Sequence, residues 1–76
     1  MPSAFVCIRT SSGCENEVLE DLRKYKGVKE AYVLYGVYDI IAKVESRTMD
    51  GVKSVIRNKI RKHDRVEQTV TYIVMG

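Results

Sequence analysis

Apolar positions recur along the chain with two spacings, and these spacings separate strand-like from helix-like segments. The strand-like runs, rich in β-branched and aromatic residues, are 4–8, 28–35, 38–45 and 66–75. Between them, apolar residues three and four positions apart are typical of amphipathic helices, one ending near Tyr25 and the other near Lys62. The pattern therefore predicts the order β-α-β-β-α-β.

Short polar motifs mark where these elements begin and end. Ser12–Glu15 fits the S-x-x-E capping box, which predicts the start of the first helix, and Lys26-Gly27 follows its end. Gly36-Val37 separates two strand-like runs and predicts a tight two-residue hairpin turn. Ser46–Thr48 offers caps for the second helix, and His63-Asp64 interrupts it.

A βαββαβ order is typical of the ferredoxin-like α+β fold, in which two helices cover one face of a four-stranded antiparallel sheet. The other face is left open. The first strand has apolar residues at both parities, and a strand that is apolar on both sides is expected to be covered on both. We therefore expect the open face to pack against a second copy. The predicted dimer interface consists of Phe5, Cys7, Ile41 and Ile73.

Size and composition favour the same conclusion. A chain of 76 residues, 45% apolar with a net charge of +3, predicts one globular domain spanning residues 1–76. Its core is too small for a wide margin of stability, so a disulfide, a metal or a partner subunit is expected to support it. Cys7 and Cys14 match no common zinc spacing, which favours self-association over a metal, although a Cys7–Cys14 disulfide stays open.

Targeting signals point to the compartment. The sequence shows no secretory leader and no apolar run long enough to cross a bilayer. We expect a soluble cytoplasmic protein with reduced thiols and no association with a membrane. No residue pattern indicates a cofactor or a metal.

Two segments resemble a known family. The segment LYGVYDIIAKVE, residues 34–45, resembles the G-x-[YF]-D segment and following apolar run of the Lrp/AsnC family, the leucine-responsive and related feast/famine regulators. The closing TVTYIVM, residues 69–75, resembles the terminal T-x-T strand of that family. The resemblance covers essentially the whole chain and corresponds to the effector-binding half of such a regulator, the RAM domain (regulation of amino acid metabolism).

One departure from the family pattern changes the expected function. Family members usually carry an N-terminal helix-turn-helix domain, whereas here the first strand begins within a few residues of Met1. The sequence thus predicts a stand-alone RAM module for which direct DNA binding is not expected. The resemblance implies homodimers, further assembled into rings such as octamers or decamers, and pairing with full-length Lrp/AsnC regulators. It also implies an amino acid or related metabolite held at subunit interfaces near the hairpin.

The ligand-binding residues follow from the resemblance and from side-chain chemistry. The predicted set is Tyr35, Gly36, Tyr38, Asp39, Thr69, Thr71, Tyr72, Ile73 and Val74, with Met49 as a weaker match. Asp39 offers a charge-assisted acceptor to an ammonium group, and the backbone at Gly36 allows close approach of a carboxylate. Each has a structural alternative: Gly36 suits a hairpin turn, and an aspartate at position 39 can bond its own backbone.

Two other functions compete with effector binding. Basic residues gather between Lys53 and Arg65, either as a solvated helix end or as phosphate contacts of a nucleic-acid accessory protein. The RNA-recognition fold shares the strand order, but the third strand lacks its basic-Gly-aromatic pattern, so RNA stacking is not expected. The other alternative is a small dimeric ferredoxin-like enzyme. No nucleophile–base or carboxylate pair supports it, and His63 is interpreted as a surface residue, so we predict no catalytic residues.

Overall fold

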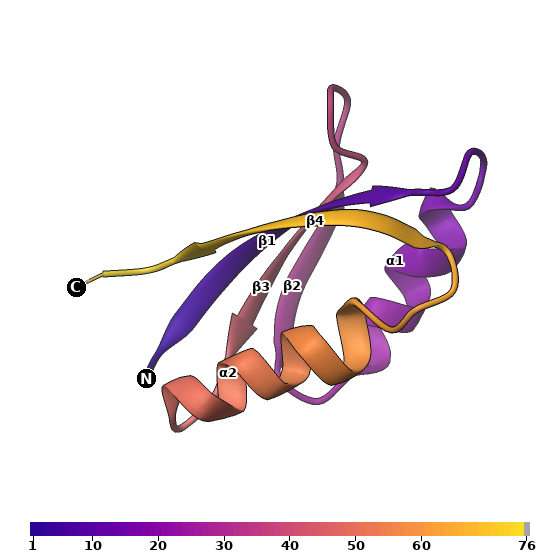
Figure 1. Cartoon of the computed structure of the whole chain (residues 1–76). Coiled ribbons are helices and arrows are strands. Elements are labelled where there is room, and N and C mark those ends of the chain that lie inside the picture. The colour runs from indigo at the N-terminus through magenta and orange to yellow at the C-terminus, as the bar shows by residue number, and fades with distance from the viewer. Residues whose placement is uncertain (76) are drawn as a thin grey trace.

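The computed structural model describes residues 1–75 and confirms the ferredoxin-like arrangement (Figure 1). Its elements are β1 (Ser3–Thr10), α1 (Glu15–Lys24), β2 (Val28–Val33), β3 (Ile40–Glu45), α2 (Met49–Val55), the π-helical turn η1 (Ile56–Ile60) and β4 (Val66–Ile73). All strand pairs are antiparallel, in the order β2-β3-β1-β4. Both helices lie on one face of the sheet, as Figure 1 shows.

Alternation along β1 creates the core. Ala4, Val6 and Ile8 are fully buried beneath the helices, whereas Phe5 and Cys7 between them face the open side. The helix-side partners are Val18 and Leu22 of α1, Val52 of α2, Ile56 and Ile60 of η1, Ala31 of β2, and Ile40, Ala42 and Val44 of β3. Burial of these side chains is the main favourable term for folding.

The two helix starts differ from each other. Thr48 caps α2 as predicted, because its Oγ1 accepts a hydrogen bond of 3.0 Å from the N–H of Gly51. The capping box predicted at Ser12 is wrong: α1 begins at Glu15, and its cap residue, Cys14, forms no side-chain capping bond. A backbone turn precedes the helix in place of the capping box, and in it the N–H of Cys14 donates to the carbonyl of Ser11 at 3.0 Å. Glu15 and Glu17 in the first turn favour the positive end of the helix.

The second helix does not stay α-helical to Lys62 as predicted. After Val55 it widens into the π-helical turn η1, where the N–H of Arg61 donates to the carbonyl of Ile56 at 2.9 Å. Ile56 and Ile60 are both buried across this turn, so the wider turn keeps both side chains in the core. No helix of the described span, residues 1–75, is long and apolar enough to cross a bilayer.

The β2–β3 connection is longer than the predicted two-residue turn. The strands end at Val33 and resume at Ile40, and the N–H of Leu34 donates to the carbonyl of Asp39 at 2.7 Å. The intervening loop projects beyond the sheet (Figure 1). Gly36 has φ +145°, a conformation that L residues rarely adopt, so a turn role for this glycine is confirmed. The last strand is also shorter than predicted, ending at Ile73 and not at Met75.

One predicted interface residue lies on the wrong face. Phe5, Cys7 and Ile41 do face the open side, where Cys7 pairs with Ile41 in register. Ile73 pairs with Ala4, which is buried under the helices, so its side chain lies on the helix side. Tyr72, opposite Phe5, and Val70, opposite Cys7, are β4 residues on the open face. The error arises because a shift of one residue along a strand moves a side chain to the other face.

Gly51 generates a prediction about stability. It lies in the first turn of α2, and a Cβ there would stand 2.8 Å from the Cβ of Ser46 and against its hydroxyl. We expect Gly51→Ala to lower the free energy of unfolding by about 1 kcal/mol or more, because this overpacking outweighs the better helix propensity of alanine. Urea denaturation measures the loss. It should shrink when Ser46→Gly is also present; an equal loss in both backgrounds would refute the steric cause.

Candidate functional site

Arg9 at the end of β1 fixes the base of the β2–β3 loop. Its Nε donates to the carbonyl of Val37 at 3.3 Å, and its guanidinium carbon lies 5.7 Å from the centre of the Tyr38 ring. Such cation–π contacts stabilise exposed loops modestly. The sequence prediction missed Arg9. A signal was present, since Arg9 continues the alternation of Phe5 and Cys7 on the open face.

Asp39 bonds a neighbouring strand, not its own turn. Its Oδ2 accepts from the backbone N–H of Thr10 at 2.8 Å and lies 3.3 Å from the Thr10 hydroxyl, while the Asp39 N–H donates to Ile8 at 2.9 Å. The β1–β4 register is irregular between Arg9 and Thr10, and Thr10 is only 5% exposed. The carboxylate therefore satisfies a buried donor at this irregularity.

A first hollow lies at this end of the sheet. It encloses about 420 Å³ and is lined by Arg9, Thr10, Ser11, Ser12, Gly13, Glu15, Val37, Asp39 and Glu67. Of the predicted loop residues, Asp39 alone borders it. Tyr35 is fully exposed, and nothing lies within 4 Å of a Cβ placed on Gly36. The tip of the loop thus touches little of its own chain.

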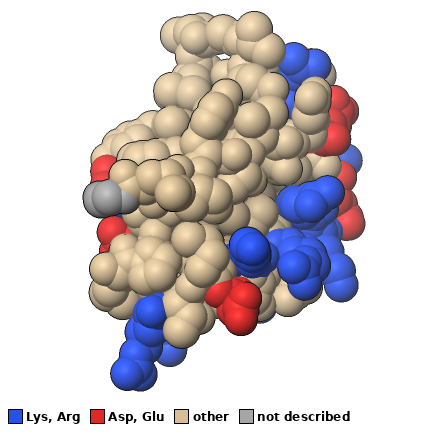
Figure 2. Space-filling view, turned by 60° about the vertical axis from the view of Figure 1, so that its left-hand side comes forward, with Lys and Arg blue, Asp and Glu red and all other residues tan. Residues whose placement is uncertain are grey.

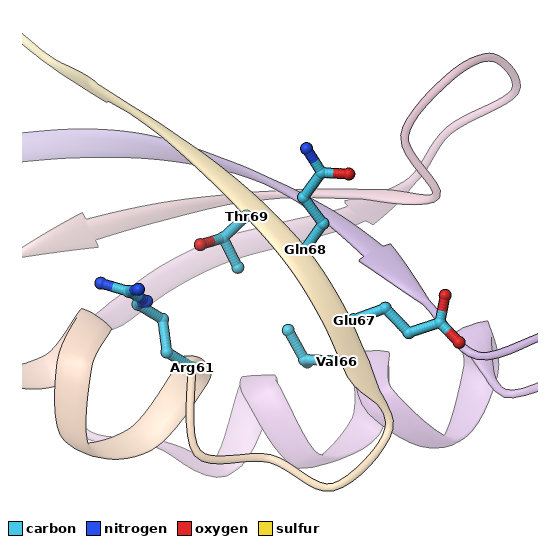
Figure 3. A pocket seen from close by; sticks show the side chains of 5 residues that line it. All are labelled: Arg61, Val66, Glu67, Gln68 and Thr69. Carbon is cyan, nitrogen blue, oxygen red and sulfur yellow. The ribbon is translucent and has the colours of Figure 1, made fainter.

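The predicted strand residues line two further hollows beside β4. Thr69 borders the second, about 310 Å³, with Arg61, Val66, Glu67 and Gln68 (Figure 3). In Figure 3 the Thr69 and Val66 side chains point to the side where Arg61 lies, whereas Gln68 points the other way. Thr71 and Ile73 border the third hollow, about 220 Å³, with Lys53, Ile56, Arg57 and Arg61.

Shared residues connect these hollows in a series. Glu67 borders the first and second, and Arg61 borders the second and third. β4 is an edge strand, so its outer side is free for further contacts. The N–H of Val74 donates inward to Ser3 at 3.0 Å, and alternation along the strand therefore directs the N–H and C=O of Ile73 and Thr71 outward.

The remaining predicted residues lie elsewhere. Tyr72 is exposed on the open face, Val74 follows the end of β4, and Met49 packs against the core. The structure thus brings Thr69, Thr71 and Ile73 to one side of β4 but does not gather all the predicted residues into one cavity of a single chain.

His63 is not the surface residue that the sequence suggested. Its side chain is 11% exposed, its Nε2 lies 2.8 Å from an Asp21 oxygen, and its Nδ1 accepts from the N–H of Arg65 at 3.0 Å. Asp21 is distant from His63 in the sequence, so an inspection of the residues near His63 could not identify it as an acidic partner. The pair connects α1 to the turn before β4. Among residues 1–75, no group of three or more His, Cys, Asp or Glu side chains could hold a metal, and Cys7 and Cys14 are free thiols.

Two tyrosines have displaced pKa values. Burial, and then the nearby Asp21 carboxylate, raise the pKa of Tyr25. The pKa of Tyr32 is raised chiefly by the hydrogen bond of 2.8 Å that its hydroxyl donates to Glu30. Both phenols therefore stay protonated at neutral pH, and Tyr32 presents its ring on the open face opposite Ile41.

Comparison with known proteins identifies the family. A family model described as the Lrp/AsnC ligand binding domain matches residues 3–76. An uncharacterized HTH-type transcriptional regulator of Pyrococcus furiosus is 35% identical over 74 residues, which cover 93% of this chain and 49% of that protein. The chain belongs to the Lrp/AsnC family and corresponds to its ligand-binding domain. It spans about half the length of the curated relatives it matches.

Solved structures of similar proteins support the same family assignment. The crystal structure of FFRP-DM1 superposes with a TM-score of 0.94 at 44% identity, covering 99% of this chain and 100% of that one. The structure of Escherichia coli AsnC superposes with a TM-score of 0.89 at 33% identity, covering 99% of this chain and 51% of that one. Several of the relatives are named as transcriptional regulators, and the matched part of each is the ligand-binding domain.

The role of Asp39 at the strand irregularity can be separated from any role toward a ligand. Asp39→Ala leaves the buried N–H of Thr10 without its acceptor, so we expect the free energy of unfolding to fall by about 1–3 kcal/mol. Asp39→Asn retains an acceptor oxygen and should lose clearly less. Urea denaturation of both variants checks this; equal losses would contradict the assignment.

Proposed function

We propose that this chain is an effector-binding module that holds an amino acid between two copies of itself. The observation that carries the proposal is the separation of the two parts of the predicted site. Tyr35 is fully exposed and open space surrounds Gly36 in the projecting loop, while Thr69 and Thr71 line hollows beside β4. A loop from one copy inserted beside β4 of another would bring the two parts together.

The chemistry of these groups suits a small zwitterion. Outward N–H groups of Ile73 and Thr71 offer donors to a carboxylate, and the threonine hydroxyls donate or accept. Asp39 keeps one carboxylate oxygen, Oδ1, without a hydrogen bond within the described residues, which leaves an acceptor for an ammonium group. Exposed Tyr35 and Val37 provide apolar surface for closing the site.

Association through the open face is the second element of the proposal. Phe5, Tyr32 and Tyr72 are partly exposed there, beside half-buried Cys7 and Ile41. Figure 2 shows a broad surface below the projecting loop whose centre carries no charged side chain and whose margins carry both basic and acidic ones. A surface of this kind on a small domain is typical of a protein interface. The same face would allow pairing with a full-length Lrp/AsnC regulator.

Nucleic-acid contact is the second candidate function for the basic residues. Lys53, Arg57 and Arg61 line a hollow beside β4, where they would face a small ligand, so we favour effector binding. The enzyme alternative is the weaker one, because the relatives that the chain matches are named as regulators. Regulation through a bound effector, carried out with a partner that contacts DNA, is the function we infer.

A thermal-shift panel tests the proposal directly. A ligand that binds only the folded state stabilises it by mass action and so raises the melting temperature. At a ligand concentration one hundred times Kd, the free energy of unfolding increases by about 2.7 kcal/mol. We expect one class of the twenty amino acids, at millimolar concentration, to raise the melting temperature selectively. A flat panel would overturn the amino acid proposal.

A mixing experiment tests whether two copies build the site. Tyr35→Ala with Val37→Ser alters the exposed loop, and Thr69→Val with Thr71→Val alters the strand; each pair should abolish effector binding on its own. The two proteins are mixed under conditions in which subunits exchange, and effector binding is measured by calorimetry. Part of the binding sites should be restored, because the wild-type loop of one variant then lies beside the wild-type strand of the other.

Two outcomes would contradict this arrangement. No recovery on mixing, with subunit exchange verified by native mass spectrometry, would place both parts in one chain. A monomer at micromolar concentration in sedimentation equilibrium would remove the second copy altogether. Replacing one variant by a full-length regulator in the same assay tests the proposed mixed assembly.

A further inference from the structure

We infer that the effector carries a negatively charged side chain, so that the ligand is an acidic amino acid and not a neutral one. This inference rests on the proposed function, since it concerns the ligand of the same site. It comes from a row of cations beside β4 for which the fold provides no partner.

The row consists of Lys53, Arg57 and Arg61, which recur every four residues along α2, η1 and the residue after it. Residues four apart lie on the same side of a helix. All three border the third hollow together with Thr71 and Ile73. Each is exposed, and within residues 1–75 none of them forms an ion pair or a side-chain hydrogen bond.

The surroundings do not neutralise these charges. No acidic side chain lines the third hollow, and Glu67 is the acid that borders the second, where Arg61 also lies. The outward N–H groups of Ile73 and Thr71 add further donors along the same side of the strand. The hollow thus presents several donors and an excess of positive charge.

A ligand carboxylate would use this arrangement in a way that a neutral side chain would not. Arginine guanidinium groups bind carboxylates through paired, charge-assisted hydrogen bonds, which are stronger than neutral ones. An acidic amino acid has two carboxylates, one for the backbone donors of β4 and one for the cationic row. Lys59 lies on the same helical turn yet lines none of the described hollows, so it serves as a control for charge alone.

Isothermal calorimetry with glutamate, glutamine, aspartate and asparagine tests the inference on the intact chain. We expect an acid to bind about tenfold or more tightly than its amide, and its affinity to fall more steeply with added salt. Arg61→Gln should reduce the affinity for the acid tenfold to a hundredfold and the affinity for the amide far less. Lys59→Gln is the matched control and should leave both affinities nearly unchanged. Arg61→Glu should abolish the preference for the acid.

The outcomes separate this inference from the proposed function. Amides or aliphatic amino acids that bind as tightly as the acids, or Arg61→Gln that leaves acid affinity unchanged, would overturn the inference and leave the module's function intact. Binding of none of the twenty amino acids to the wild-type chain would overturn both. Loss of acid binding in Lys59→Gln equal to that in Arg61→Gln would show a general charge effect and likewise overturn the assigned site.

Discussion

The position of β1 in the middle of the sheet constrains the rest of the structure. It bonds β3 on one side and β4 on the other, and its alternate residues Ala4, Val6 and Ile8 form the floor of the core. That alternation fixes which residues of the neighbouring strands face the helices. It places Thr69 and Thr71 on the helix side and Tyr72 on the open side, because paired residues share a face.

The consequence for function is a division of surfaces. One side of the sheet is occupied by helices, and two of the hollows lie between β4 and the end of the second helix. The other side carries Phe5, Cys7 and Ile41, the residues that we propose pack against a partner. The loop between β2 and β3 belongs to neither surface, and Arg9 and Asp39 hold its base to β1 while the tip projects. A module with separate surfaces for association and for ligand contact can connect the two through movement of one subunit against another.

The sequence predicted the fold because the spacing of apolar residues indicates which side chains are buried. In this domain those side chains are buried by packing within one chain. It predicted Thr48 as a cap and Gly36 as a turn from local chemistry. It failed where the decisive partner is distant in sequence: His63 meets Asp21, and Asp39 meets Thr10. It misplaced Ile73 because the face of a strand residue depends on register, which the bulge-like irregularity near Thr10 helps to set. The predicted ligand residues do not share one cavity of this chain, and a sequence alone gives no information on how two copies would bring them together.

The free edge of β4 has a further consequence. An unpaired edge strand is a template on which another chain can add, and repeated addition leads to aggregation. Lys53, Arg57 and Arg61 lie alongside this edge, so two copies approaching edge to edge would bring like charges together. The cations that attract an anion would thus also protect the empty domain from joining its own kind into fibres. Soluble behaviour and ligand choice would then depend on the same side chains, and evolution could not alter one without affecting the other.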